Sequence, residues 1–379
     1  MDGDAANFDL PRAFDLMRRY QATKDPELLY ELLQLKPFGY AAPDISPGQL
    51  HVMAAAELIE RFEQTQQTRY LDKAVDLLRE AARAQPEGSW QQQRILADLG
   101  SWLHTRFERG GNPADLDEAV EIGRRTVAAT GTGHPDRAAM LSKLGTSLLS
   151  RADHGEQRPA PDLDEAIDCY RRAVAEATND HERAMFLTNL SSALQSDFTK
   201  TGNPASLDES VDANQRALAA LPADTPYQAA IHANLGRALL GRFGRRGEQP
   251  DLDQAIAHAQ QAVRLLGPRD EHVREVRQIL GRALRSRFEW LRDPADLDAA
   301  IEQFRLVAKG VPADHAQYSG YVAGLSSALL VRFGESGDMA DFSESAAWAR
   351  RESGSDEADD SSVGERWMDP RTGSDVDEH

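Results

Sequence analysis

The side chains that could carry out chemistry in this chain are one cysteine, ten histidines and many paired acids. Cys169 falls inside the apolar pattern of an expected helix at 162–177, where a free cysteine behaves as a small hydrophobic side chain. The histidines are scattered and the acid pairs recur with a fixed period, so no distinct group of nucleophile, base and acid stands out. The sequence also lacks a phosphate-binding loop, a zinc-protease helix and a hydrolase elbow. We therefore expect no catalytic residue, no metal site and no cofactor, in a chain that is not an enzyme.

The recurrence of short motifs is the main signal. Runs that resemble Asp-Leu-Asp-Glu-Ala recur 44 to 47 residues apart. Their second residues are Leu71, Leu116, Leu163, Leu207, Leu252, Leu297 and Phe342. Two further markers keep the same register, one usually Leu-Gly, as at Leu99-Gly100, and one usually Arg-Phe, as at Arg106-Phe107. A fixed period of this size predicts an array of stacked supersecondary units.

Each unit has the pattern of two helices. Apolar residues at Ile231, Leu235 and Leu239 form a helical stripe, and a linker with glycine and an X-Pro pair follows. The second helix is expected to begin with a capping box, in which an acid or serine caps the helix and a glutamate lies three residues later. The predicted boxes are Asp115/Glu118, Asp162/Glu165, Ser206/Glu209 and Asp341/Glu344. With two helices at the N-terminus, seven pairs predict an all-α right-handed solenoid of about sixteen helices.

The helix contacts of the motif carry a family resemblance. The first helices contain Leu-Gly-x-x-Leu, and the second helix of the first unit carries Ala74, Leu78, Ala81 and Pro86. This pattern resembles the tetratricopeptide repeat (TPR), with both turns extended beyond the family's usual period. It is most similar to long-period actinobacterial arrays that often precede a caspase-like CHAT domain, although no CHAT domain is expected in this chain. The resemblance implies a superhelix whose concave face is lined by first helices.

The markers also predict three segments. Residues 1–48 are expected to form a helical cap, and residues 49–351 seven repeats, of which the last is incomplete. Residues 352–379 hold ten acids and two arginines and are expected to be a disordered acidic tail. The N-terminus shows no apolar signal segment and the chain no long apolar run, so we expect a cytoplasmic protein that does not bind membranes.

The charge distribution bears on the kind of partner. The net charge of −19 argues against general affinity for nucleic acid. Residues 231–292, however, contain twelve arginines, no lysine and seven acids, which gives this segment a charge of +5. A basic segment within an acidic protein suggests an anionic partner surface. The arginine of the Arg-Phe marker has two interpretations, a binding ladder or a structural pair with an acid of the following helix start. We favour the structural pair because a binding residue has no reason to recur in every unit.

Three functions are compatible with this sequence. The favoured one is an adaptor that binds an extended or acidic protein segment in the concave groove. Related domains use Lys, Asn and Arg on this face to hold a peptide carboxylate. The expected partner-binding residues flank the Leu-Gly markers on the same side: Lys143, Asn189, Asn234, Arg237, Arg282 and Arg285. The alternatives are a regulatory or sensor subunit of a split CHAT-type protease or another effector enzyme, and nucleic-acid binding by the arginines. The sequence indicates neither the partner's identity nor an oligomeric state.

Overall fold

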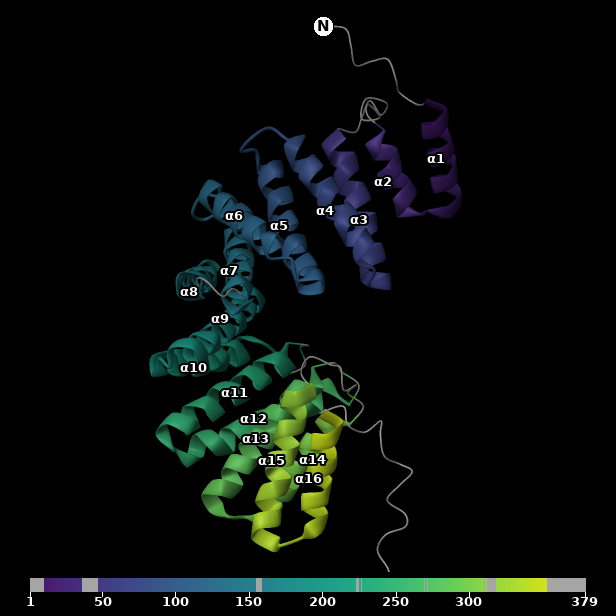
Figure 1. The fold of residues 1–379 in the computed structure, drawn as a ribbon. Helices are drawn as coiled ribbons and strands as arrows, with labels where there is room; N and C mark the ends of the chain where they lie inside the picture. Colours follow the sequence, from purple (N-terminus) through teal and green to yellow (C-terminus); the bar gives the residue numbers. More distant parts are fainter. Residues whose placement is uncertain are drawn as a thin grey trace, which may run out of the picture. The chain divides into compact units, whose positions relative to one another are not determined.

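The structure is a computed structural model that describes residues 10–35, 47–154, 159–222, 225, 227–268, 270, 272–309, 311 and 318–352. Within these residues the chain forms sixteen α-helices and no strand (Figure 1). The predicted all-α architecture of helix pairs is therefore confirmed. The predicted acidic tail lies outside the described residues, except for Glu352, which ends the last helix.

Two short helices, α1 (Leu10–Thr23) and α2 (Pro26–Gln34), precede seven helix pairs, which we number as repeats 1 to 7. The first helices of the pairs are α3 Pro47–Thr65, α5 Trp90–Gly110, α7 Arg137–His154, α9 Asp180–Thr201, α11 Gln228–Arg246, α13 Val273–Leu291 and α15 Tyr318–Ser336. The second helices are α4 Thr68–Arg83, α6 Pro113–Ala129, α8 Pro159–Glu176, α10 Pro204–Ala220, α12 Gln249–Leu266, α14 Pro294–Ala308 and α16 Met339–Glu352.

The chain divides into two compact units, 1–227 and 228–379. The N-terminal unit holds α1, α2 and repeats 1–4, and the C-terminal unit holds repeats 5–7. In the N-terminal unit α2 packs against α3 and α4, and Lys73 of α4 forms an ion pair with Glu27 of α2 at 2.8 Å. The two N-terminal helices therefore lie against repeat 1, which is where a cap would have to lie.

The marker residues form the core between the two helices of a repeat. Leucines of both markers, such as Leu99 and Leu116, are buried. The glycine after the first leucine lets an aromatic ring of the second helix lie on the first helix. A Cβ added at Gly145 would lie 2.9 Å from the ring of Tyr170, and one added at Gly281 would lie 2.7 Å from the ring of Phe304. The missing Cβ at these glycines therefore allows the two helices of a repeat to approach closely.

The predicted capping boxes are wrong. In α6 the cap is Asn112, whose side chain accepts a hydrogen bond from a backbone amide at 3.2 Å, and Pro113 takes the first helical position. Helices α10 and α14 begin in the same way at Asn203 and Asp293. Proline is suited to the first position because its missing N–H would be unpaired there in any case. The helix therefore begins before the acid, and the predicted caps lie in its first turn instead: Asp115, Asp162, Ser206 and Asp341.

The first-turn aspartate binds the arginine marker of its own repeat. Nε and Nη2 of Arg106 donate to the two carboxylate oxygens of Asp115 at 2.9 and 2.6 Å. All five aspartates in such pairs are buried, and a buried carboxylate needs a partner of this kind. This geometry confirms the structural interpretation of the arginine marker. The same two-bond pair joins Arg151 to Asp162, Arg242 to Asp251, Arg287 to Asp296 and Arg332 to Asp341.

Repeat 4 reverses this pair. Asp197 stands at the position of the arginine, and Ser206 stands at the position of the aspartate. The Ser206 hydroxyl donates to the Asp197 carboxylate, and both side chains are buried. A hydroxyl therefore supplies the hydrogen bond that a guanidinium supplies in the five other pairs.

A second set of ion pairs joins the second helices of neighbouring repeats. Nε and Nη2 of Arg79 on α4 donate to the two carboxylate oxygens of Glu118 on α6 at 3.0 and 2.6 Å. The glutamates that were predicted as members of capping boxes are thus partners of the preceding repeat. The corresponding pairs are Arg124–Glu165, Arg171–Glu209 and Arg305–Glu344.

Candidate functional site

The predicted partner-binding residues lie on the first helices of repeats 3 to 6. Within each unit these helices contact the first helices of the neighbouring repeats, α7 with α5 and α9, and α13 with α11 and α15. The predicted set is divided between the two units. Two members lie in the N-terminal unit, Lys143 and Asn189, and four lie in the C-terminal unit, Asn234, Arg237, Arg282 and Arg285.

The two residues in the N-terminal unit bridge neighbouring first helices. The Lys143 ammonium lies 3.0 Å from a carboxylate oxygen of Asp98 on α5. The Asn189 side chain donates to the hydroxyl of Ser142 on α7 at 3.2 Å. Both side chains therefore already have partners in the array, and binding a ligand would require an exchange.

Two of the four residues in the C-terminal unit make similar contacts. Arg237 on α11 forms an ion pair with Glu275 on α13. Arg285 on α13 donates to the hydroxyl of Ser327 on α15 at 2.9 Å and lies 3.4 Å from Glu289 of its own helix. Asn234 is half-buried on α11.

Arg282 differs from its neighbours. It is exposed, and it has no ion pair or hydrogen bond within the described residues. Arg237 and Arg282 occupy the same position in consecutive repeats, and so do Glu275 and Gly320. The acid that neutralises Arg237 is therefore a glycine where Arg282 would need it, and this substitution leaves the guanidinium uncompensated.

The surface of α15 beside Arg282 is built from small residues. Gly320 and Ala323 are exposed, and Ser327 is half-buried. Contact between α13 and α15 here includes the Arg285–Ser327 hydrogen bond and a hydrogen bond from Gln278 to the Gly320 carbonyl at 3.4 Å. The exposed guanidinium of Arg282 therefore lies next to a face of α15 whose small side chains leave room for a ligand.

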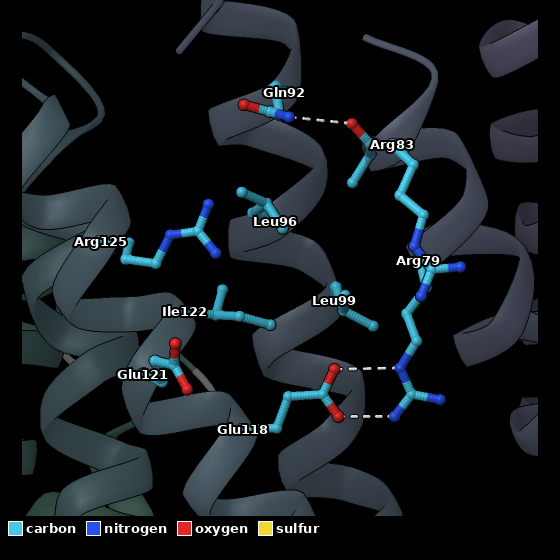
Figure 2. A pocket seen from close by; sticks show the side chains of 10 residues that line it. Arg79, Arg83, Gln92, Leu96, Leu99, Glu118, Glu121, Ile122 and Arg125 are labelled. Atoms are coloured by element: carbon cyan, nitrogen blue, oxygen red, sulfur yellow. Dashed lines mark hydrogen bonds and ion pairs between the residues drawn. The ribbon is translucent and has the colours of Figure 1, made fainter. Parts of the chain in front are cut away.

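A pocket of about 330 Å³ lies in the N-terminal unit, between α4, α5 and α6. Figure 2 shows Arg83 and Arg125 on opposite sides of the pocket, with Leu96 and Ile122 between them. Sequence reasoning missed this site because its two arginines, Arg83 and Arg125, belong to none of the recurring motifs. The other lining residues are Arg79, Ala82, Gln92, Leu99, Glu118 and Glu121.

Burial favours the neutral form of one cysteine and of two histidines. Burial raises the pKa of the Cys169 thiol to about 12, which agrees with the prediction of a packed helix residue. His232 on α11 and His258 on α12 stack, with their Nδ1 atoms 2.8 Å apart. Burial lowers the pKa of His232 to about 4, assisted by the charges of His258 and Arg264. Burial also lowers the pKa of His258.

The described part of the chain has neither a candidate metal site nor a candidate membrane span. It contains no cluster of three or more histidine, cysteine, aspartate or glutamate side chains that could hold a metal ion. In the same residues no helix is both long and apolar enough to cross a membrane.

Comparisons with known proteins report similarity at the level of structure only. No family model matches the sequence, and no curated protein matches it significantly. Similar solved structures include TPR-like repeats of a Podosopora anserina protein described as a kinesin light chain, with a TM-score of 0.41 and 19% identity, over 56% of this chain and 97% of that one. BtubC (BKLC) from P. vanneervenii gives a TM-score of 0.36 and 17% identity over 67% and 89% of the two chains. The S. pombe nuclear import adaptor Nro1 gives a TM-score of 0.35 and 12% identity, over 81% of this chain and 99% of that one.

Proposed function

We propose that the chain is a non-enzymatic protein-interaction scaffold and that its C-terminal unit binds an extended acidic segment of a partner protein. The observation that carries this proposal is the exposed guanidinium of Arg282, whose acid partner is replaced by Gly320. An uncompensated guanidinium attracts a carboxylate and can donate two parallel hydrogen bonds to it. The segment would lie on the faces of α13 and α15.

The shape of α15 supports an extended ligand. Because Gly320 and Ala323 have little or no side chain, a peptide backbone can approach this helix closely. The polar side chains of Gln278 and Ser327 lie within the same surface and can bond to backbone amides and carbonyls of the segment. An acidic extended peptide therefore fits the site in both charge and shape.

The remaining predicted residues take a secondary part in this proposal. Arg237 and Arg285 each have an acid nearby, so a ligand carboxylate would have to compete with Glu275 or Glu289. Asn234 lies on the same helix as Arg237 and adds a polar contact. Lys143 and Asn189 offer an equivalent surface in the N-terminal unit. Binding is expected to depend on Arg282 more than on any other member of the set.

The test uses a fluorescein-labelled peptide of about ten alternating glutamates and serines, which extends over roughly 30 Å. Its affinity for the full chain is measured by fluorescence anisotropy at low salt. Arg282→Gln is expected to weaken binding about tenfold, because one hydrogen bond to a charged group contributes roughly 1.5 kcal/mol. The matched control is Arg264→Gln on α12, which removes the same charge from an exposed arginine that bonds Gln261 of its own helix. Equal losses in the two variants would contradict the proposal.

A second variant restores the missing acid. Gly320→Glu places a carboxylate where Glu275 stands one repeat earlier, so Arg282 should form the ion pair that Arg237 forms. We expect this variant to bind the peptide at least tenfold more weakly, with little change in its melting temperature. Full binding by a folded Gly320→Glu variant would show that the free guanidinium is not the site.

A further inference from the structure

We propose that the pocket between α4, α5 and α6 is a second binding site, which takes a carboxylate and an adjacent apolar side chain from an acidic segment of a partner protein. The pocket lies entirely in the N-terminal unit and does not involve Arg282. This proposal can therefore be tested independently of the proposed C-terminal site.

The next repeat shows why this pocket is open. Between α6, α7 and α8, the position of Gln92 is taken by Arg137, which donates to a backbone carbonyl at the end of α6 at 2.6 Å and lies 3.3 Å from Glu176. Gln92 donates to the corresponding carbonyl of α4 at 3.1 Å, but its side chain is shorter, and Ala129 stands at the position of Glu176. The space that a guanidinium and a carboxylate occupy in one repeat is thus left open in the repeat before it.

Arg125 also departs from its equivalents. In the two following repeats its position is held by Arg172 and Arg216, and each pairs with the acid four residues earlier in its own helix, at 3.4 and 3.3 Å. Arg125 has Glu121 at the same spacing, but it makes no ion pair or hydrogen bond within the described residues. Figure 2 shows its guanidinium directed over the pocket, toward Leu96, rather than toward Glu121.

The opposite wall carries a second uncompensated guanidinium. Arg83 ends α4 and has no partner among the described residues, whereas the same position holds Ala128 in the next repeat. Arg79, one turn earlier, is already held by both oxygens of Glu118. Arg83 and Arg125 are therefore the two cations that remain available at this pocket.

The lining defines the chemistry of the ligand. The floor between the two arginines is apolar, with Leu96 and Leu99 from α5 and Ile122 from α6 (Figure 2). The volume of about 330 Å³ is at the lower end of the range of ligand pockets, roughly 300–1,000 Å³. It suits one or two side chains of a peptide. A carboxylate between the arginines and a leucine-type side chain on the floor would use both features.

Nucleic acid is the competing ligand for two arginines. Sequence-independent binding of single strands relies on aromatic side chains that stack with bases, as well as on a basic groove. The ten lining residues include no aromatic side chain, and two of them are glutamates. An acidic peptide therefore fits this lining better than an oligonucleotide does.

The test measures binding of a labelled peptide of about ten alternating glutamates and leucines. The full chain carries Arg282→Gln, so that binding at the C-terminal site is weakened about tenfold and the pocket is measured against it. Replacing Arg83 and Arg125 together by glutamine should weaken binding at least tenfold. Arg172→Gln, at the register of Arg125 but already paired, should leave the affinity within twofold. The alternating glutamate–serine peptide should bind this background at least fivefold more weakly than the glutamate–leucine peptide.

A closing variant tests the pocket itself. Gln92→Arg combined with Ala129→Glu copies the Arg137–Glu176 pair into repeat 2 and leaves the net charge of the chain unchanged. It should abolish binding while the melting temperature stays equal or rises. The proposal is overturned if the closed, folded variant still binds the peptide, if Arg172→Gln reduces binding as much as the double variant, or if an oligothymidylate displaces the peptide better than unlabelled peptide does. Loss of the C-terminal site would change none of these results.

Discussion

The reversed pair of repeat 4 allows a direct test of how the repeats are held together. In wild type the Ser206 hydroxyl donates to the buried carboxylate of Asp197. Ser206→Asp gives this repeat the acid of the other repeats without its arginine, so two carboxylates meet in a buried place. Asp197→Arg gives the arginine without the acid. The double variant recreates the arginine–aspartate pair that holds five other repeats.

The geometry sets the size of each effect. Two like charges about 4 Å apart repel by roughly 4 kcal/mol at an effective dielectric constant of 20. Ser206→Asp should therefore lower the free energy of unfolding by about 2–4 kcal/mol at pH 7, less if one carboxyl takes up a proton. Asp197→Arg should cost about 1–3 kcal/mol, because a largely buried guanidinium loses its water without gaining an acid. The double variant should lie within about 1 kcal/mol of wild type.

The assay is urea unfolding of the four proteins, followed by circular dichroism at pH 7. Asp117 accepts a hydrogen bond from Arg151 of the next repeat, and Asp164 holds the position of Asp117 one repeat later. Asp164 has no partner within the described residues, so it can also bind the arginine that the double variant introduces at position 197. A positive interaction between the two substitutions of about 3 kcal/mol is the expected result. A double variant as unstable as the sum of its singles would refute the idea that the arginine–aspartate pair is an exchangeable part of the repeat.

Three further outcomes follow from buried groups. The free energy of unfolding should be highest above pH 6.5, where histidine is neutral in the unfolded chain, and should fall by roughly 1–2 kcal/mol as the pH drops toward 4. The reason is that histidine in the unfolded chain takes up a proton in this range, whereas the half-buried His232 of the folded protein does not. A urea midpoint that does not change with pH in this range would contradict this. Gly281→Ala should lower the free energy of unfolding by about 1–2 kcal/mol, because the added Cβ would lie 2.7 Å from the Phe304 ring. Gly244→Ala is the control: its Cβ would have no atom within 4 Å, so the same assay should find it neutral or stabilising. Cys169 should react with a thiol reagent at pH 8 only after denaturant is added, because burial raises the pKa of its thiol to about 12; rapid labelling of the native protein would disprove its burial.

The helix pairs and the structural arginine were predictable from the sequence because their signals are local or repeated. A stripe such as Ile231, Leu235 and Leu239 specifies a helical face by spacing alone. The arginine marker recurs in register with an acid nine to eleven residues later, so its pairing follows from the repeat itself. Both features depend on contacts within one repeat.

The errors concern helix starts and contacts between neighbouring repeats. The capping boxes were misassigned because Asp115 and Glu118 have the right spacing, while the competing signal, Asn112 before Pro113, marks the true start. Glu118 binds Arg79 of another repeat, a contact that depends on the offset between neighbouring second helices. Contacts between repeats also distinguish Arg237, which pairs with Glu275 of the next repeat, from Arg282, so the sequence did not separate these two arginines. The open pocket, which results from a shorter side chain at Gln92, was missed for the same reason.

Binding of acidic segments at two independent places is tested most directly by isothermal titration calorimetry of the full chain with the glutamate–leucine peptide at low salt. Wild type is expected to bind two peptides per chain. Arg282→Gln and the closed pocket variant, Gln92→Arg with Ala129→Glu, should each keep one site of full affinity, and their combination should keep none. A stoichiometry that stays the same in all four folded proteins would contradict both sites.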